Sequence, residues 1–216
     1  MTKSYHIDPE SPSAEVINLA ATVLRDGGIV VFPTETVYGL GALADSKFGP
    51  HEIFEVKVRP GSLPIPLLVE TEDALDTWGS DIPDYAHRLA HEYWPGAITL
   101  VVHASEKVPR DFRAPDGTIG LRSPDHEVVQ ELLAAAGGPI FATSANTHGN
   151  PAPGSFDEVE PRIITAADIV LDGGETQHQQ ASTVVLCTGP EPIVVREGAI
   201  PADAVMAIAA GGVAAQ

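Results

Sequence analysis

Helix-like and strand-like segments alternate along this chain, and that alternation limits the possible folds more than any other feature of the sequence. Apolar residues recur at helical spacing in five segments, and short apolar runs separate them. The expected strands cover residues 29–32, 97–104, 118–122, 139–146, 167–174, 182–187 and 192–197, of which the last two flank "TGPE" as a hairpin. We therefore predict an α/β (α+β) domain with three layers, in which helices flank a mixed, twisted sheet.

The same patterns predict where the five helices begin and end. Ser11 and Pro12 are good residues for a helix start, and Gly27–Gly28 would end that helix. Asp81 could cap a helix through residues 84–94, and Asp125 could cap one over residues 126–136. The other two helices are expected at residues 51–57 and 202–210.

A length of 216 residues fits one domain over residues 1–216, with its core at about 13–200 and a C-terminal helix and frayed tail at 201–216. The sequence contains no run of about 18 apolar residues, so no membrane span is expected. The N-terminal residues do not follow the basic-then-apolar pattern of a signal peptide. One cysteine, Cys187, excludes an internal disulfide framework. These features predict a cytoplasmic protein.

The net charge is strongly negative, because 30 acidic residues face 12 basic ones and give −18. Such a surface repels polyanions at a distance, so strong direct binding to nucleic acid is disfavoured. The acids are spread along the chain and do not form one acidic tail. A halophilic source would account for this charge, and an ordinary acidic cytosolic protein is the alternative.

Small polar residues end several of the predicted strands. They occur in "PTET" after residue 32, in "LRSP", in "ATSAN" and in "VVRE". Each of them alone could be a turn or a cap, since Ser, Thr and Asn often bond their own backbone in loops. Together they predict a polar ligand site at the strand ends of an open sheet.

Four cations stand near these polar strand ends, in a chain that has few cations. Lys57 and Arg59 are two residues apart and would share one face of an extended segment, as would Ser144 and Asn146. Arg122 and Arg196 each close an apolar strand. Arg and Lys bind phosphate and carboxylate, so this set predicts a polyanionic or carboxylate ligand. Surface ion pairs with the abundant carboxylates are the alternative.

Other familiar sites are absent from the sequence or weakly indicated. Neither a Walker motif nor GxGxxG occurs. His87 and His91 could share a helix face toward a metal, but an exposed polar face is the simpler interpretation because no third ligand is evident. Cys187 lies within a strand and is expected in the core. We predict no metal ligands among the protein side chains.

Six motifs follow one another along the chain, namely "GGIVVFPTETVYGLGALA", "KVRP", "WPGAITLVV", "GLRSPDH", "ATSANTHGNPAP" and "STVVLCTGPEPIVVREGAI". In this order they resemble the YrdC-like (YrdC/TsaC/YciO) family of threonylcarbamoyl-AMP synthases. The resemblance extends from about Ser13 to Ile200 and implies the short, single-domain form. It implies a twisted α/β fold with a concave, positively lined cavity. It also implies a reaction of L-threonine, bicarbonate and ATP that gives threonylcarbamoyl-AMP and pyrophosphate. A partner transferase would then modify adenosine 37 of tRNA.

The resemblance also implies roles for individual residues. A catalytic tetrad would consist of Lys57, Arg59, Ser144 and Asn146. Threonine would contact Thr36, Arg122, Ala142, Ser182, Thr34 and Tyr38. ATP would contact Arg59, Thr118, Ser144, Ala152 and Arg196, with Mg²⁺ arriving on ATP and no organic cofactor. Ala142 and Ala152 correspond to positions that bind mainly through the backbone.

The loop "KVRPGSLPIPL" departs from the family pattern. It is longer than usual, Ile65 stands where a Lys or Asn is common, and Glu70 stands where a basic residue or His is common. These differences favour an alternative, a paralogue that binds nucleotide or RNA and makes little adenylate. A carbamoyl-transfer domain of hydrogenase maturation is a third possibility, but it normally belongs to a much larger chain.

Overall fold

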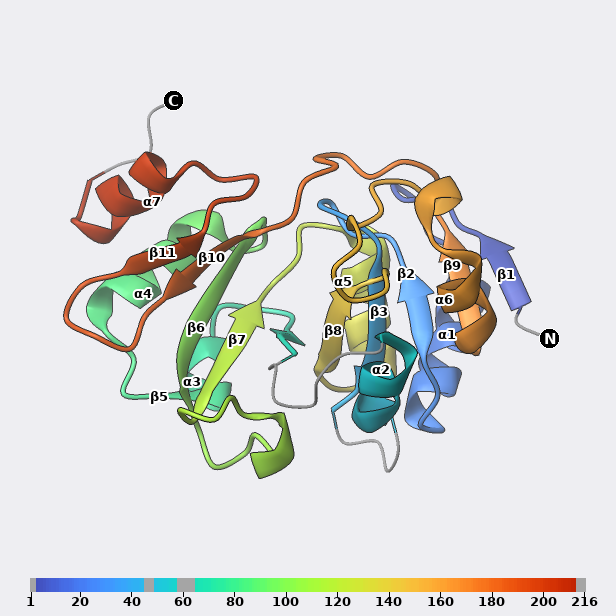
Figure 1. Ribbon diagram of the computed structural model, residues 1–216, viewed down its shortest axis with the longest axis horizontal. Coiled ribbons are helices and arrows are strands. Elements are labelled where there is room, and N and C mark those ends of the chain that lie inside the picture. The colour runs from blue at the N-terminus through green and yellow to red at the C-terminus, as the bar shows by residue number, and fades with distance from the viewer. Residues whose placement is uncertain (1–2, 45–48, 58–64, 213–216) are drawn as a thin grey trace.

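Eleven strands of the described residues form one mixed sheet in this computed structural model (Figure 1). The structure describes residues 3–44, 49–57 and 65–212. The strands are β1 (Lys3–His6), β2 (Val30–Phe32), β3 (Gly39–Leu43), β4 (Leu67–Leu68), β5 (Gly79–Ser80), β6 (Ile98–Ala104), β7 (Thr118–Arg122), β8 (Ile140–Ser144), β9 (Ile169–Asp172), β10 (Thr183–Leu186) and β11 (Ile193–Arg196).

Seven α-helices accompany the sheet in the described residues. They are α1 (Ala14–Arg25), α2 (Gly49–Lys57), α3 (Ala74–Trp78), α4 (Asp84–Tyr93), α5 (Glu127–Ala136), α6 (Pro161–Ala166) and α7 (Ala202–Ala209). Two single 3₁₀ turns cover Arg110–Phe112 and Phe156–Glu158. The predicted mixed α/β fold is therefore confirmed.

The strand order is β1-β9-β2-β3-β8-β4-β7-β6-β10-β11, with β5 paired to β6 away from this path. The sheet contains parallel pairs, such as β2 with β9, and antiparallel pairs, such as β3 with β8. The middle of the sheet is narrow, because β4 has two residues and is the strand that joins β8 to β7. The sheet thus has two halves, which lie right and left of centre in Figure 1.

In the half that contains β2, β3, β8 and β9, both faces are covered. Val30 and Phe32 pack with α1 and α5, while Val31 between them joins the larger core on the other face. This alternation follows from the two-residue period of a strand. The helices α1 and α5 also contact each other, and α2 and α6 lie over the opposite face.

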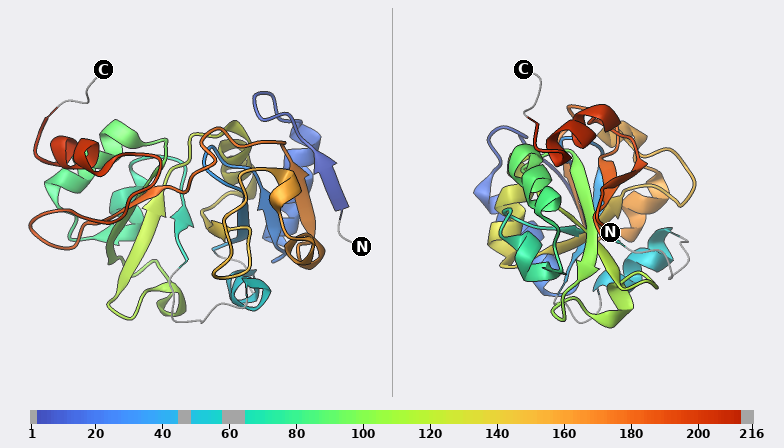
Figure 2. Two further views of the ribbon diagram at one scale, coloured as in Figure 1. Left: turned by 45° about the horizontal axis from the view of Figure 1, so that its top comes forward. Right: turned by 90° about the vertical axis from the view of Figure 1, so that its left-hand side faces the viewer.

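In the other half, helices cover one face. Leu100, Leu121 and Val185 belong to the larger core, to which α4 and α7 also contribute. Figure 2 shows α4 and α7 side by side at this end of the molecule. Thr99 and Gly120 alternate with those core residues and so point to the opposite face of the sheet. That face carries the site described below.

The stretch from Val30 to Gly41 is a strand, a polar turn and a second strand. Pro33 follows the last residue of β2, and β3 returns antiparallel, with Phe32 opposite Gly39 and Val30 opposite Gly41. A Cβ added to Gly41 would lie 2.7 Å from Ile140 Cγ2 and 2.9 Å from Phe32 Cε1. This glycine therefore makes room for the Phe32 ring within the sheet.

The capping residues of three helices differ from the predicted ones, although α4 begins at Asp84 as predicted. The N-cap of α1 is Ser13 and that of α5 is His126, so the predicted starts at Ser11 and Asp125 were wrong by one or two residues. Asp81 does not cap α4, because its φ is +53° and the N-cap is Pro83. A proline disfavours helical geometry in the residue before it, so α4 cannot begin upstream of Pro83.

The C-terminal helix and the hairpin were predicted correctly. Helix α7 covers Ala202–Ala209, and β10 pairs antiparallel with β11. Cys187 is 1% exposed, and burial raises the pKa of its thiol to about 12, which makes it an unreactive core residue. No helix in the described ranges is long and apolar enough to cross a membrane.

Candidate functional site

A pocket of about 320 Å³ lies on the open face of the sheet, where the two halves meet. Its lining comes from the turn after β2 and from β4, β6, β7, β8, β10 and β11. Ten residues predicted from the sequence share this lining, namely Thr34, Thr36, Tyr38, Thr118, Arg122, Ala142, Ser144, Ala152, Ser182 and Arg196. The polar strand ends therefore converge on one site.

The hydroxyls of Thr34 and Thr36 have a defined direction of hydrogen bonding. Thr34 Oγ1 donates its single proton to the backbone oxygen of Val37 at 2.7 Å. The 2.8 Å contact between the two hydroxyls must then be donated by Thr36. Thr36 Oγ1 consequently faces the pocket as an acceptor, because its own proton is already used.

Arg122 lies at the end of β7, and two of its three side-chain nitrogens have partners among the described residues. Its Nη2 donates to Thr36 Oγ1 at 2.8 Å and lies 2.7 Å from Glu35 Oε1, and its Nε donates to the Gly96 oxygen at 3.3 Å. Its Nη1 donates to none of the described residues. An arginine carries five N–H donors, so the two on Nη1 remain for a ligand.

Arg196 lies at the end of β11 and forms hydrogen bonds with Ser182, in the segment before β10. Its Nη2 donates to the Ser182 backbone oxygen at 2.7 Å, and Ser182 Oγ lies 2.9 Å from Thr99 Oγ1. Burial, and after it the charge of Arg122, lowers the pKa of the Arg196 guanidinium. Two like charges thus face one pocket, and an anion bound between them would offset their repulsion.

The predicted tetrad is described for three of its four members, since Arg59 lies outside the described residues. Lys57 is 2% exposed, and its Nζ donates to the Ser144 backbone oxygen and, at 3.0 Å, to Asn146 Oδ1. Ser144 Oγ donates to the same Asn146 oxygen. These three residues therefore form one hydrogen-bonded group at the wall of the pocket.

Lys57 reaches this group from a helix. It is the last residue of α2, so the predicted extended segment with Lys57 and Arg59 on one face does not apply to Lys57. The other predicted pair, Ser144 and Asn146, does share one side, because β8 ends at Ser144 and the chain then turns. Neither Lys57 nor Asn146 is among the lining residues, and both lie behind Ser144.

A carboxylate outside the pocket holds the loop that follows Asn146. Glu160 Oε1 accepts from the Thr147 backbone N–H at 2.8 Å and from Asn150 Nδ2 at 3.1 Å, and Oε2 accepts from Thr147 Oγ1 at 2.7 Å. Asn146 Nδ2 in turn donates to the backbone oxygens of Thr147 and Asn150. Glu160 therefore fixes the loop on which the Asn146 amide depends.

We expect Glu160→Gln to weaken the acid dependence of folding stability. The Thr147 hydroxyl, followed by other hydrogen bonds, lowers the pKa of Glu160 below its usual 4.5. A lowered carboxyl pKa contributes stability above the unfolded-state pKa, and this stability is lost as pH falls through the folded-state pKa. Urea unfolding from pH 7 to pH 3 would measure it. If wild type and variant lost stability in parallel below pH 4.5, the predicted contribution of Glu160 would be absent.

Tyr38 lines the pocket, but its hydroxyl forms hydrogen bonds with the backbone of a loop after β9. The side chain is fully buried, and Oη donates to the Gly174 oxygen at 2.8 Å and accepts from the Gly173 N–H at 3.0 Å. Burial raises the pKa of Tyr38 to about 12. The hydroxyl thus ties the turn after β2 to the loop after β9.

Tyr38→Phe should therefore affect folding more than substrate binding. The variant removes two hydrogen bonds to backbone groups of the half-buried Gly173 and the exposed Gly174, and each such bond contributes about 0.5–1.5 kcal/mol to the free energy of unfolding. Denaturant unfolding would measure that loss, and the KM values of the proposed substrates should stay within about twofold. A large rise in the threonine KM without loss of stability would instead place the hydroxyl in direct contact with the ligand.

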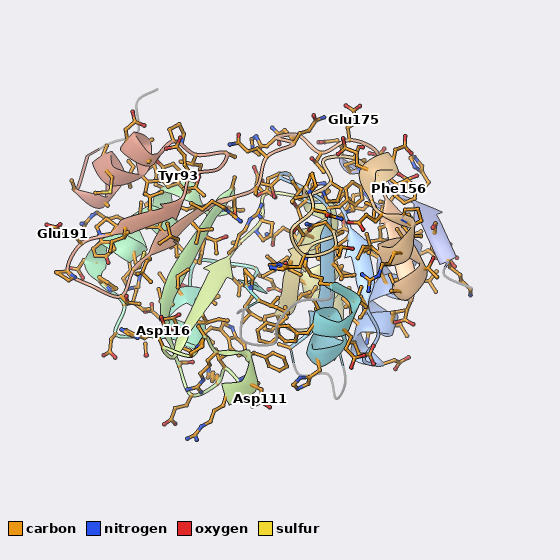
Figure 3. All side chains as sticks on the ribbon, viewed as in Figure 1. Tyr93, Asp111, Asp116, Phe156, Glu175 and Glu191 are labelled. Atoms are coloured by element: carbon orange, nitrogen blue, oxygen red, sulfur yellow. The ribbon has the colours of Figure 1, made fainter. Side chains whose placement is uncertain are left out.

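Three other predicted residues line the pocket, and two of them already use part of their polar groups within the protein. Thr118 Oγ1 donates to Asp116 Oδ1 at 2.7 Å, and Asp116 lies at the turn that leads into β7 (Figure 3). The Ala142 N–H donates to the Pro66 oxygen at 2.9 Å, which leaves no free donor on that residue. Ala152 lies in the loop between β8 and the second 3₁₀ turn.

Metal-binding groups do not gather in the part of the chain that the structure describes. No cluster of three or more His, Cys, Asp or Glu side chains with suitable geometry occurs in those ranges. His87 and His91 instead face Asp76 at 3.5 Å and Glu72 at 3.4 Å, near the surface.

Two buried polar residues of the site were missed in the sequence. Thr99 is a single hydroxyl within an apolar strand, and this isolation was a usable signal. Glu35 stands between two pocket threonines and is 2% exposed. A buried carboxylate needs a cation, and Arg122 was one of the four cations that the sequence indicated near the site.

Comparison with known proteins places this geometry in a family. The family model for Sua5, YciO and YrdC proteins, which carries the description "Telomere recombination", matches residues 22–198. The chain belongs to this family.

Three members of the Sua5/YciO/YrdC family illustrate the relationship. "Threonylcarbamoyl-AMP synthase" of Pyrococcus abyssi is 38% identical over 87% of this chain, which spans 55% of that relative. The solved structure of P. abyssi Sua5 complexed with L-threonine has a TM-score of 0.91 at 36% identity and matches 96% of this chain and 61% of that chain. The solved structure of Escherichia coli YciO has a TM-score of 0.84 at 30% identity and matches 92% of this chain and 96% of that one.

The two departures from the family pattern lie at different places in the structure. Ile65 is fully buried in the larger hydrophobic core, so its side chain does not line the pocket. Glu70 is exposed after β4, where its backbone oxygen accepts from Ser123 Oγ at 2.9 Å. At position 65, the polar residue that is common in the family is thus replaced by an apolar residue of the core. Glu70 is not among the residues that line the pocket.

Proposed function

We propose that this protein is an L-threonylcarbamoyladenylate synthase. It would condense L-threonine, bicarbonate and ATP into threonylcarbamoyl-AMP and pyrophosphate. This would be the first step toward N6-threonylcarbamoyladenosine at position 37 of tRNA. The observation that carries the proposal is the pocket in which Arg122, Arg196 and the predicted threonines meet. The comparison that supports the proposal is the P. abyssi Sua5 structure with L-threonine, which matches 96% of the present chain.

The pocket offers groups that match an α-amino acid. Arg122 Nη1 has two donors for a carboxylate, and Thr36 Oγ1 has a lone pair for a neighbouring N–H. Ser182 lies beyond them next to Arg196. A donor pair beside an acceptor suits a ligand whose carboxylate and amine are attached to one carbon.

The proposed reaction needs two bond-forming steps. The threonine amine attacks bicarbonate, water leaves, and a carbamate forms. A carbamate oxygen then attacks the α-phosphorus of ATP, the bond to the bridging oxygen breaks, and pyrophosphate leaves. Both steps bring anions together, so positioning and charge neutralisation would supply most of the catalysis. No covalent enzyme intermediate is required.

The chain's own groups would divide this work. Lys57 would neutralise the reacting phosphate and carboxylate, and Arg196, Ser144, Thr118, Ala152 and Arg59 would contact ATP. Asn146 would orient Lys57 and Ser144, because its side-chain oxygen accepts from both. Mg²⁺ would arrive on ATP and offset phosphate charge when bound.

Pyrophosphate release tests the proposal. The assay uses ATP and Mg²⁺ in high-potassium buffer, with threonine and bicarbonate together, each alone, and with serine in place of threonine. We expect release to require both threonine and bicarbonate. No release by protein that is folded and binds ATP would contradict the synthase assignment.

A paralogue that binds nucleotide or RNA with little synthesis is the second candidate. The lengthened loop and the buried Ile65 favour it. ATP binding without pyrophosphate release would support it. Salt-dependent affinity for tRNA would support its RNA-binding form, although the net charge of −18 disfavours such binding.

The cellular setting follows from the proposed reaction. The product would pass to a threonylcarbamoyl transferase that acts on tRNA, so the synthase itself needs no strong direct contact with nucleic acid. A cytoplasmic location would fit this role. We also propose that residues 1–216 act as one domain of the short form.

A further inference from the structure

Glu35 is a buried carboxylate with one charged partner. It is 2% exposed, and its Oε1 lies 2.7 Å from Arg122 Nη2. Neither carboxylate oxygen has hydrogen-bond geometry to any described residue. Glu35 is not among the pocket-lining residues, whereas its neighbours Thr34 and Thr36 are.

The ion pair with Arg122 is the main compensation for this buried charge. Glu35 also interacts electrostatically with His126, whose pKa is lowered mainly by burial. An imidazole with a lowered pKa is neutral near pH 7. Among the described residues, Arg122 is thus the fully charged cation that pairs with Glu35.

Stability alone does not explain such a pair. Removing two charges from water costs several kcal/mol per ion, and well-packed apolar residues often replace a buried ion pair without loss. The value of the pair must therefore be sought in what it does to the guanidinium. Glu35 and Thr36 together occupy Nη2, and the Gly96 oxygen takes Nε, which leaves Nη1 as the free end.

We propose that Glu35 is a positioning residue for the amino-acid site, which it serves by holding Arg122 with Nη1 toward the pocket. This inference rests on the proposed function. Without the carboxylate, the guanidinium can turn Nη2 toward the pocket and change its distance from Thr36. A ligand that needs the Nη1 donors and the Thr36 lone pair together would then bind less well.

A double-mutant cycle tests whether Glu35 acts through Arg122. Loss of a charged partner costs about 1.5–3 kcal/mol, which corresponds to a factor of about 10 to 150. We expect Glu35→Gln to raise the threonine KM by at least about tenfold and the ATP KM by less than about twofold. In an Arg122→Lys background, Glu35→Gln should add less than about a further twofold.

The controls separate positioning from folding. Glu92→Gln removes one carboxylate from an exposed site on α4 and should change neither KM. Urea unfolding shows whether each variant is folded, and Glu35→Asp, which restores the charge, should recover part of the threonine affinity. Equal rises in both KM values, or fully additive effects in the cycle, would overturn the proposal.

The same cycle distinguishes this inference from the proposed function. If wild-type protein releases no pyrophosphate but binds L-threonine in calorimetry, the synthase assignment fails and the cycle is read from the threonine Kd. If wild type is active and the cycle shows no coupling, the role of Glu35 alone fails. If wild type neither reacts nor binds threonine, both are wrong.

Discussion

Lys57→Gln should lower kcat/KM for pyrophosphate release by about a hundredfold to a thousandfold while the protein stays folded. Lys57 is buried behind Ser144 and places its charge at the wall of the pocket. A glutamine amide can still donate to Asn146, but it carries no charge to offset the phosphate and carbamate. The loss should appear mainly in kcat, because these charges are closest in the transition state.

The matched control is Lys107→Gln, which removes the charge of an exposed lysine. That variant should retain activity, so a general effect of net charge in this acidic protein can be excluded. Thermal unfolding establishes that both variants are folded. Adenylate formation at the wild-type rate by folded Lys57→Gln would remove Lys57 from the proposed mechanism.

Gly198→Ala should damage both stability and the site, although it adds a single methyl group. A Cβ at this position would lie 2.1 Å from the Ala181 backbone oxygen, 2.5 Å from the Ser182 carbonyl carbon and 2.6 Å from the Ser182 oxygen. These are backbone atoms that cannot rotate away. Overpacking of this kind costs about 1–3 kcal/mol and sometimes more.

The displaced segment carries Ser182, whose backbone oxygen holds Arg196. We therefore expect the KM for threonine or ATP to rise together with the loss of stability. Gly189→Ala is the control, because its Cβ would have one neighbour, the Glu191 oxygen at 3.9 Å. If Gly198→Ala unfolded at the same urea concentration as Gly189→Ala, the close packing at residue 198 would be disproved.

The sequence predicted most of the sheet because long apolar strands are visible without tertiary information. The strands around residues 98–104, 118–122 and 183–196 appear as runs of apolar residues that end in polar ones. Helix starts were less certain. Several Ser and Asp residues stand near each start, and the choice among them depends on backbone angles such as the φ of +53° at Asp81.

The elements that were not predicted owe their geometry to contacts with distant parts of the chain. β4 has two residues and exists because β7 and β8 pair with its two edges. β3 contains Gly39 and Gly41, which individually disfavour a strand and are needed here because Phe32 fills the space beside them. No local pattern carries that information.

For the site, residue types were predictable and hydrogen-bond roles were not. The spacing of Ser144 and Asn146 indicated that they act together, and their contact agrees. The sequence could not indicate that the Tyr38 hydroxyl is turned away toward Gly174, or that Lys57 arrives from a helix end. Both depend on how separate segments pack.

The two-residue strand β4 has a consequence for how this protein would respond to its ligands. It is the one strand of the described residues that carries hydrogen bonding across the sheet from β8 to β7, while the pocket draws Thr36 and Ser144 from one side and Arg122 and Ser182 from the other. A ligand that contacts residues from both halves would form a second link between them, in addition to β4. A substitution at Leu67, which lies in β4 but not in the pocket lining, should therefore shift ligand affinity through the link between the two half-sheets and without touching a substrate atom.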